Sequence, residues 1–217
     1  MIKRILKVLG VLLLSLIVLF FIVYLLMDKP VPNGVQGEEA ERLADEMLGA
    51  LNKPGFDSLE HIAFTFKGVH SYEWDKKEKK VQVKWGENDV MLDLSRSTDE
   101  YTMLEYKAYS FFINDSFWLI APFKVRDQGV VRSTVDTETG RGLLVTYTSG
   151  GITPGDSYLW ILDDNGFPIA WRLWTSNVPI GGLEFSWEEW GEYDDVWFSQ
   201  LHQSSILNLD MTGVEVQ

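Results

Sequence analysis

The amino-acid sequence predicts a mainly β (α+β) domain. We expect a curved antiparallel sheet of about nine to eleven strands, with an N-terminal helix and a central helical insert, preceded by one transmembrane helix. Three observations support this fold class. Short segments of alternating polar and apolar residues recur along the chain, and turn residues join them. A long apolar stretch, residues 106–125, interrupts the series and carries helix-capping residues. The strand-like segments do not alternate with helices, as they would in a parallel sheet.

Residues 1–28 form a predicted signal anchor that enters the membrane through residues 5–27. From Val8 to Met27 the chain carries no charge, and about twenty helical residues span the roughly 30 Å hydrocarbon core of a bilayer. Three basic residues stand on the N-terminal side: Lys3, Arg4 and Lys7. The positive-inside bias therefore predicts a single-pass protein of the inner (cytoplasmic) membrane, with its N-terminus inside and its domain in the periplasm or outside. A cleaved signal peptide is the alternative, but the run is long and lacks small residues at a cleavage site.

Residues 29–37 form a predicted linker, because two prolines and the pair Asn33-Gly34 disfavour a helix. A helix is predicted to follow and to end at Asn52, Pro54 and Gly55. Its apolar residues recur at intervals of three and four and so share one face: Ala40, Leu43, Ala44, Met47, Leu48 and Leu51. Because its opposite face is acidic, this helix is expected to pack on the sheet and not on a membrane surface.

The strand-like segments fall into two groups. The first is a meander with one buried and one exposed face, at residues 59–67, 71–75, 81–85 and 90–94. The second group follows the apolar stretch, with strands predicted at residues 130–135, 143–148, 158–162, 167–175, 183–190 and 196–207, and a final edge strand at 211–216. Turn sequences such as Asp163-Asp164-Asn165-Gly166 separate them. Residues 38–217 are expected to form one domain.

The apolar stretch at residues 106–125 is predicted to be a buried helical plug inside the β-rich shell. Residues 114–116 (Asn-Asp-Ser) are residue types that cap helices, so we expect one helix to end near Ile113 and a second to begin after them. Pro122 is expected to stop the second helix.

Some of the later strands are apolar on both faces. Trp160 is followed by Ile161 and Leu162, and Trp171 and Trp174 lie close together in another segment. A strand that is wet on one side does not have this pattern. These strands must be covered on both faces, by the central helix or by a ligand.

Composition excludes several kinds of chemistry. The chain has no cysteine, which excludes disulfides, thiolate metal sites and a cysteine nucleophile. The net charge is −13, and all 32 acidic residues follow residue 27, which disfavours nucleic acid as a partner. His61, His70 and His202 do not have the spacing of metal ligands. We therefore expect no metal, no cofactor and no nucleic-acid partner.

No nucleophile motif is present either, so the sequence predicts a protein that is not an enzyme. Acidic residues near tryptophans, at Glu188, Glu189, Asp194 and Asp195, leave a glycan hydrolase as a weaker alternative. Adjacent acids in one strand point to opposite faces, which argues against a catalytic pair.

Three strings carry a resemblance to known families. They are residues 114–124 (NDSFWLIAPFK), 144–151 (LVTYTSGG) and 154–160 (PGDSYLW), and they resemble an uncharacterised family of exported proteins from Bacteroidota-type bacteria. The order of elements across residues 38–216 resembles the LolA/LolB-like superfamily of lipoprotein carriers and sensors. That resemblance implies an open half-barrel that encloses helices over a hydrophobic cavity.

The function expected from these features is a membrane-tethered, extracytoplasmic protein that binds a lipid, an acyl chain or a lipoprotein. The candidate ligand-binding residues are the large apolar side chains of the central stretch and the later strands: Phe111, Phe112, Phe117, Trp118, Trp160, Trp171, Trp174, Phe185 and Trp187. The alternative is a protein-interaction module in which the helices fill the barrel and leave no room for a ligand.

Overall fold

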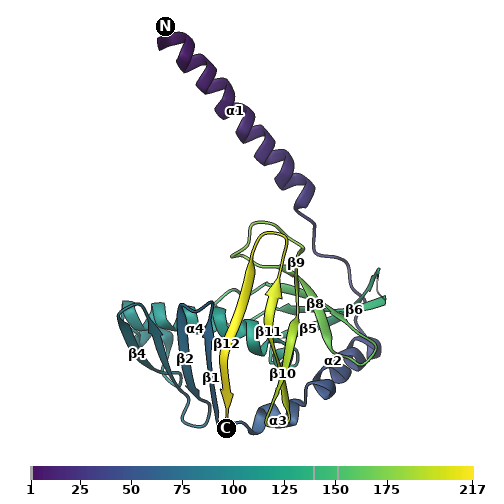
Figure 1. The fold of residues 1–217 in the computed structure, drawn as a ribbon. Helices are drawn as coiled ribbons and strands as arrows, with labels where there is room; N and C mark the ends of the chain where they lie inside the picture. Colours follow the sequence, from purple (N-terminus) through teal and green to yellow (C-terminus); the bar gives the residue numbers. More distant parts are fainter. Residues whose placement is uncertain (1, 139, 151) are drawn as a thin grey trace.

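The computed structural model describes residues 2–138, 140–150 and 152–217, which form two antiparallel sheets and several helices (Figure 1). The larger sheet has seven strands in the order β10-β11-β12-β1-β2-β3-β4. They are β1 (His61–Phe66), β2 (His70–Asp75), β3 (Lys80–Trp85), β4 (Asn88–Asp93), β10 (Glu188–Tyr193), β11 (Val196–Gln203) and β12 (Asn208–Val216). The smaller sheet has five strands in sequence order: β5 (Val130–Thr137), β6 (Gly140–Tyr147), β7 (Ser157–Leu162), β8 (Pro168–Trp174) and β9 (Leu183–Ser186). The sheets are not closed into a barrel.

The prediction of a mainly β chain with antiparallel pairing is confirmed, as is the placement of helices before the first strand and in the middle. The strands form two sheets, however, where the sequence predicts one. The predicted strand at residues 183–190 divides at Trp187 into β9 and β10, which belong to different sheets. Trp187 is only 2% exposed, and its amide donates to the carbonyl oxygen of Ile169 at 2.8 Å. This buried residue is the corner at which the chain passes from one sheet to the other.

Strand β12 corrects the prediction of a final edge strand. It lies inside the larger sheet, between β1 and β11. Ile62 of β1 pairs with Val216, and Leu201 of β11 pairs with Asp210. A pairing between the first strand and the last has no local sequence signal, because it depends only on the path of the intervening chain.

Two helices follow the N-terminal helix α1 (Ile2–Met27). Helix α2 (Glu38–Ala50) confirms the predicted amphipathic helix. Asn52, two residues after α2 ends, is the N-cap of a short helix, α3 (Lys53–Ser58), which the sequence does not predict. The Asn52 side chain accepts a hydrogen bond from the Gly55 amide at 3.1 Å, and Pro54 lies in the first turn, where a missing N–H costs nothing. Residues that stop one helix therefore begin the next.

Helix α1 contains the residues Leu9–Met27, which by length and composition are enough to cross a membrane. Residues 29–37 connect it to the domain and are held against the smaller sheet. Val35 and Thr134 exchange two backbone hydrogen bonds of 2.9 and 2.8 Å, and the Lys29 amide donates to the Gly181 carbonyl oxygen at 3.0 Å. The predicted linker is thus anchored to the domain at both of its ends.

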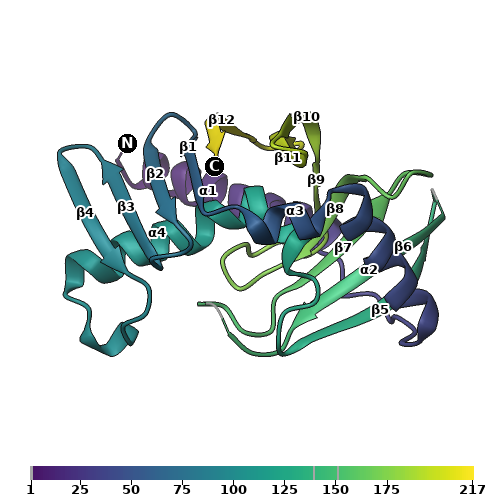
Figure 2. The same cartoon turned by 90° about the horizontal axis from the view of Figure 1, so that it is seen from below.

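Helix α4 (Met103–Ile120) lies between the two sheets (Figure 2). It follows a single 3₁₀ turn, η1 (Thr98–Glu100), and begins with a capping box in which Thr102 and Glu105 satisfy each other's backbone amides. Near its middle the ring of Phe112 meets Trp74 of the larger sheet, with centroids 5.3 Å apart. Near its end the ring of Trp118 meets Phe185 of the smaller sheet at 4.8 Å.

The predicted break in the central helix at residues 114–116 is wrong, because α4 is continuous through them. Asp115 is buried, and its carboxylate binds side chains of β2 instead of capping a new helix. The helix does end just before Pro122, as predicted, and continues as a 3₁₀ turn, η2 (Ala121–Lys124).

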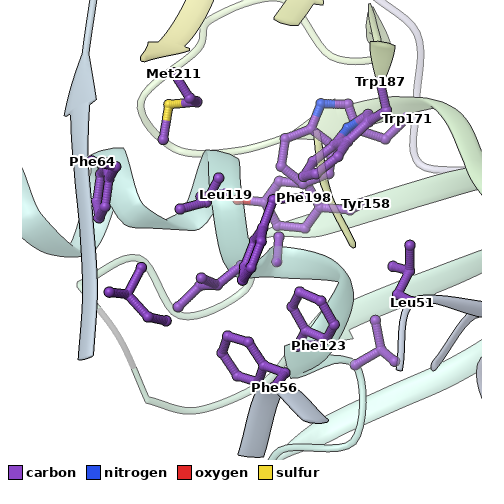
Figure 3. Close-up of a cluster of buried hydrophobic side chains, with 14 of the residues drawn as sticks. Leu51, Phe56, Phe64, Leu119, Phe123, Tyr158, Trp171, Trp187, Phe198 and Met211 are labelled. Atoms are coloured by element: carbon purple, nitrogen blue, oxygen red, sulfur yellow. The ribbon is translucent and has the colours of Figure 1, made fainter. Parts of the chain in front are cut away.

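A single hydrophobic core joins the sheets and helices (Figure 3). Phe123 of η2 stacks on Phe56 of α3, with ring centroids 4.2 Å apart, and both rings meet Phe198 of β11 edge-on. These three aromatic rings pack β11 of the larger sheet against α3 and against η2, the turn that follows α4.

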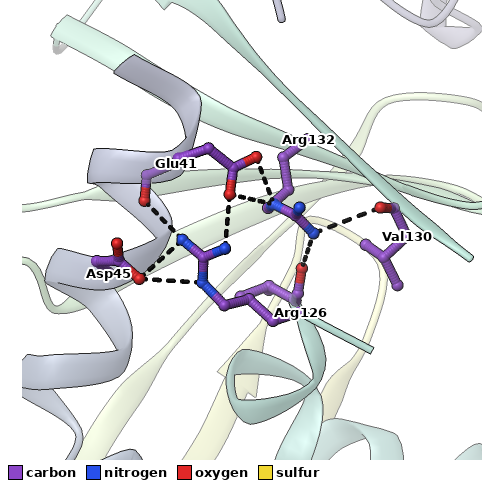
Figure 4. A network of polar contacts seen from close by, with 6 residues as sticks. Glu41, Asp45, Arg126, Val130 and Arg132 are labelled. Atoms are coloured by element: carbon purple, nitrogen blue, oxygen red, sulfur yellow. Dashed lines mark hydrogen bonds and ion pairs between the residues drawn. The ribbon is translucent and has the colours of Figure 1, made fainter. Parts of the chain in front are cut away.

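Two arginines fasten α2 to the smaller sheet (Figure 4). Arg126 contacts Glu41 at 2.6 Å and Asp45 at 2.7 Å, and Arg132 of β5 contacts Glu41 at 3.0 Å. Arg132 also donates to the carbonyl oxygen of Val125 at 2.8 Å, so it ties the end of η2 to the same network. Burial alone would raise the pKa of Glu41, but the hydrogen bonds from Arg132 and Arg126 outweigh it and lower the pKa.

Replacing Glu41 with Gln should therefore destabilise the protein at neutral pH by an amount that shrinks in acid. A carboxyl whose folded-state pKa is lowered stabilises the fold above its unfolded pKa of about 4.3, and this contribution is lost as the pH falls through the folded pKa. Urea denaturation of wild type and Glu41→Gln at a series of pH values from 7 to about 3 measures this. Glu215→Gln is the control, since Glu215 is exposed and makes no ion pair among the described residues. A stability difference for Glu41→Gln that does not change with pH would contradict the assignment.

Candidate ligand-binding cavity

A cavity of about 470 Å³ lies between α4 and the smaller sheet. From α4 the apolar side chains that line it are Phe112, Ile113, Phe117, Trp118 and Ile120. From the smaller sheet the lining residues are Tyr147, Tyr158, Trp171 and Leu173. The volume falls within the range of about 300–1,000 Å³ that is usual for small-molecule sites, and such sites are mostly apolar.

The cavity is bordered by loops at one end of the smaller sheet. Ser157, the first residue of β7, pairs with Thr146 near the end of β6 and with Trp174 at the end of β8. The β6–β7 loop and the β8–β9 loop therefore leave the sheet at the same end. Both loops contribute small or polar residues to the cavity lining, such as Ser149, Thr153 and Asn177. The β8–β9 loop also contributes the apolar Val178.

The structure brings four of the nine predicted ligand-binding residues to the cavity: Phe112, Phe117, Trp118 and Trp171. Three others, Trp160, Phe185 and Trp187, are buried in the core behind it. Phe111 faces the larger sheet and stacks on His70 with centroids 4.1 Å apart. The Trp174 indole donates to the carbonyl oxygen of Lys29 at 2.7 Å, so Trp174 contacts the linker.

An aromatic wall closes the inner end of the cavity. Trp171 meets Trp118 edge-on at 5.0 Å and stacks on Tyr158 at 4.6 Å. Behind Trp171 lie Trp160 at 4.8 Å and Trp187 at 5.1 Å. The indole nitrogens of Trp160, Trp171 and Trp187 are buried and have no hydrogen-bond partner among the described residues. Their rings contribute apolar area and stacking, and the wall has no polar anchor of its own.

One carboxylate beside the cavity is fully engaged. Asp156 is 5% exposed and lies in the β6–β7 loop. It accepts a hydrogen bond from the Thr153 hydroxyl of the same loop at 2.6 Å. It also accepts one from the Ser176 amide at 3.0 Å, and this bond ties the β6–β7 loop to the β8–β9 loop. Burial, and then the charge and hydrogen bond of Asp156, raise the pKa of Tyr158. Asp156 therefore helps to position the two loops at the mouth of the cavity. In the sequence, only the turn residues around Asp156 suggest this role.

The hydroxyl of Tyr147 is a buried polar group beside the cavity. The residue lines the cavity, and its hydroxyl is buried without a partner among the described residues. Burial raises the pKa of Tyr147 well above 10, and Tyr158 and Asp127 add to the effect. The phenol is therefore neutral at physiological pH and can either donate or accept one hydrogen bond. The sequence contains this residue within a distinctive string but gives no sign that its hydroxyl lacks a partner.

A second polar cluster, missed by sequence reasoning, fixes α4 to the larger sheet. The Asp115 carboxylate is 2% exposed and accepts from the Tyr72 hydroxyl at 2.6 Å. It also contacts His70 Nδ1 at 2.7 Å, and the Asn114 amide group donates to it at 3.0 Å. Burial, and then the charge of and hydrogen bond to Asp115, raise the pKa of Tyr72. Because Asp115 lies 45 residues from His70 and 43 from Tyr72, no local spacing reveals the cluster.

The remaining candidate chemistry is not assembled into a site. Burial lowers the pKa of His202 to about 4, so this imidazole is neutral at pH 7. In the described part of the chain no three His, Asp or Glu side chains are grouped so as to hold a metal ion. Glu188, Glu189, Asp194 and Asp195 are exposed and lie away from the cavity lining.

Comparison of the sequence with models of protein families gives no match, and comparison with curated proteins gives none either. Of the three strings that carry the family resemblance, residue 151 lies outside the described residues. Among the other residues of the strings, those that line the cavity include Asn114, Phe117, Tyr147 and Tyr158.

Replacing Asp115 with Ala should destabilise the fold, because the buried hydroxyl of Tyr72 then loses its acceptor. An unsatisfied buried polar group costs about 1–3 kcal/mol. Ser110→Ala on the same helix is the matched control, since Ser110 bonds only to the Tyr106 carbonyl oxygen one turn away and is expected to matter little. Denaturation monitored by tryptophan fluorescence gives both free energies. Equal stability of Asp115→Ala and Ser110→Ala would show that the cluster does not hold α4.

Proposed function

We propose that this protein is a membrane-tethered, extracytoplasmic binding protein for a lipid or another apolar ligand. The observation that carries the proposal is the cavity of about 470 Å³ beside α4, with Phe117, Trp118 and Trp171 in its wall. Ligand binding in such a site is driven by removal of apolar surface from water, at about 0.8 kcal/mol for each buried methylene group. The aromatic walls supply this surface without any charged partner.

The proposed location follows from α1 and from the charges around it. In this proposal α1 crosses the inner membrane once, with the N-terminus in the cytoplasm and the domain in the periplasm. The two sheets and α4 then act as the open half-barrel of the LolA/LolB-like superfamily, and the protein serves in handling or sensing envelope lipids or lipoproteins. A tether distinguishes such a protein from a shuttle that diffuses between membranes.

The polar residues at the open side suit the head of an amphipathic ligand. Lys124 forms an ion pair with Asp127, and both residues line the cavity together with Gln128. Apolar residues of α4 and β8 lie deeper. A ligand with one acyl chain and a small polar head would place its chain against Trp118 and Trp171 and its head beside these groups.

Filling the cavity should abolish lipid binding. The test uses residues 28–217, because the described core residues all lie at or after Ala40 and removal of α1 takes none of them away. Val178→Trp places a large ring in the cavity. Val131→Trp, the control, places the same ring at an exposed position outside the cavity. Native mass spectrometry should show copurified lipid on wild type and Val131→Trp but none on Val178→Trp. Binding of a fluorescent fatty acid should follow the same order.

A folded wild-type domain that is empty and does not bind the fatty acid would exclude the ligand-binding function. That outcome would favour the protein-interaction module, in which the apolar interior serves only for packing.

The unpaired hydroxyl of Tyr147 allows a further test. Tyr147→Phe should leave the empty protein as stable as wild type or stabilise it by about 1 kcal/mol, because a buried group without a partner is removed. Because this hydroxyl has almost no accessible surface toward the cavity, the variant should bind a fatty acid as tightly as wild type does. Tyr158→Phe is the comparison and should be destabilising, because it removes the interaction of the Tyr158 hydroxyl with the Asp156 carboxylate. Calorimetric titration and urea denaturation give these quantities. A Tyr147→Phe variant that is less stable than wild type would mean that the hydroxyl has a partner.

A further inference from the structure

The residues that follow α1 are bonded directly to the loop that borders the cavity. The Asp28 amide still donates to the Tyr24 carbonyl oxygen at 2.8 Å, so the helical hydrogen-bond pattern extends to the end of α1. The Gly181 amide donates to the Asp28 carboxylate at 2.8 Å, and the Lys29 amide donates to the Gly181 carbonyl oxygen at 3.0 Å. The Trp174 indole adds a third bond, to the Lys29 carbonyl oxygen at 2.7 Å.

Gly181 makes this contact possible. A Cβ atom at this position would lie 2.6 Å from the Lys29 carbonyl oxygen and 2.6 Å from the Trp174 ring, closer than real Cβ contacts come. The backbone of the β8–β9 loop therefore lies directly against the first residues after the apolar helix. If α1 spans a bilayer, Asp28 and Lys29 lie at its surface, and Gly181 is within hydrogen-bonding distance of them.

Apart from the buried Asp156, the loops at this end of the molecule carry no charge, in contrast to the acidic remainder of the domain. No Asp, Glu, Lys or Arg occurs at residues 148–155 in the β6–β7 loop, at 173–183 around the β8–β9 loop, or at 198–209 around the β11–β12 turn. The β11–β12 turn exposes two large apolar side chains, Ile206 at 57% and Leu207 at 38%. In Figure 1 this turn and the β8–β9 loop both lie at the end of the domain nearest to α1.

The charged residues closest to this turn are set back from its tip. Asp210 lies three positions beyond Leu207, and its carbonyl oxygen accepts a hydrogen bond from the Lys67 amide at 2.9 Å. An uncharged apolar tip with polar and charged residues behind it matches the order of layers from acyl chains to headgroups in a membrane. A solvated acidic surface would not match it.

From these observations we propose that this end of the domain rests on the lipid bilayer in which α1 is embedded, with the Ile206–Leu207 tip in the interface, and that the cavity receives its ligand directly from that membrane. The docking rests on the proposed membrane tether through α1, and the loading rests on the proposed ligand binding. Thr175, Asn177 and Val178 belong to the same β8–β9 loop and line the cavity. A lipid that leaves the bilayer beside α1 thus meets the cavity lining without crossing water.

The absence of cysteine allows a direct test on the full chain. Ile206→Cys carries an environment-sensitive fluorophore on its thiol, and the protein is reconstituted in phospholipid vesicles that contain brominated lipids. We expect the emission to shift to shorter wavelength and to be quenched. Lys77→Cys is the matched control because Lys77 lies in the β2–β3 turn, at the end of the sheet where Asp75 pairs with His61 and His61 bonds to Gln217. That end is separated from the Ile206 tip by β12, whose nine residues span about 30 Å. An Ile206 label that behaves like the Lys77 label overturns the docking.

A second measurement separates docking from ligand binding. Ile206→Asp alters an exposed side chain, so folding should be unaffected. We expect slower transfer of a fluorescent fatty acid from the vesicle membrane to this variant than to wild type, and unchanged binding when the fatty acid is supplied as monomer in solution. Equal transfer rates overturn loading from the membrane, while the ligand-binding function stands. A quenched Ile206 label together with no binding of the fatty acid from either source leaves the docking intact and rejects the ligand-binding function.

Discussion

The central helix α4 is apolar nearly all the way round and must be covered. This requirement determines the architecture. In α4, Ala108, Phe112 and Leu119 are buried, and Phe111, Ile113, Phe117 and Trp118 are packed against the core on other sides of the same helix. A helix of this kind is stable only when it is surrounded. The larger sheet covers its first half through Trp74 and Trp85, and the smaller sheet covers its second half through Phe185 and Trp171. Because the chain passes from the smaller sheet to the larger one at Trp187, it forms both of the sheets that cover α4.

Strands and helices with a strong local period can be predicted from this sequence, whereas features set by long-range contacts cannot. The amphipathic stripe from Ala40 to Leu51 defines α2, and alternation at Val81 and Val83 defines β3, because each pattern depends on neighbouring residues only. The break at residues 114–116 fails for the opposite reason. Asp115 has the chemistry of a cap, but Tyr72 and His70 of β2 bind it in the helix interior, and this tertiary contact outweighs the local preference.

The candidate site was predictable in kind and only partly in detail. Trp171 and Trp174 lie close together in β8, and apolar residues on both faces of a strand indicate that both faces are covered. Trp171 does contact the cavity, and Trp160 of the neighbouring strand β7 packs behind it. Alternation cannot distinguish a lining residue from a core residue, because both are apolar and both point inward. The same limit applies to Trp174, whose indole meets Lys29 of a segment 145 residues away. The loop residues at the mouth were not predicted, because small polar side chains such as Thr153 and Asn177 are typical of any surface loop.

The small side chains of the two mouth loops are the physical reason that a cavity exists beside α4. Phe117 and Trp118 face strands from one side, but Ser149, Gly150 and Thr175 supply too little volume to fill the space at the sheet's end. The cavity is open to solvent, so water or a ligand occupies it. Water against a wall of tryptophan and phenylalanine gains few hydrogen bonds, so an apolar ligand that displaces it binds favourably. In the proposed function, this gain is the physical reason that the walls select an occupant that is largely apolar.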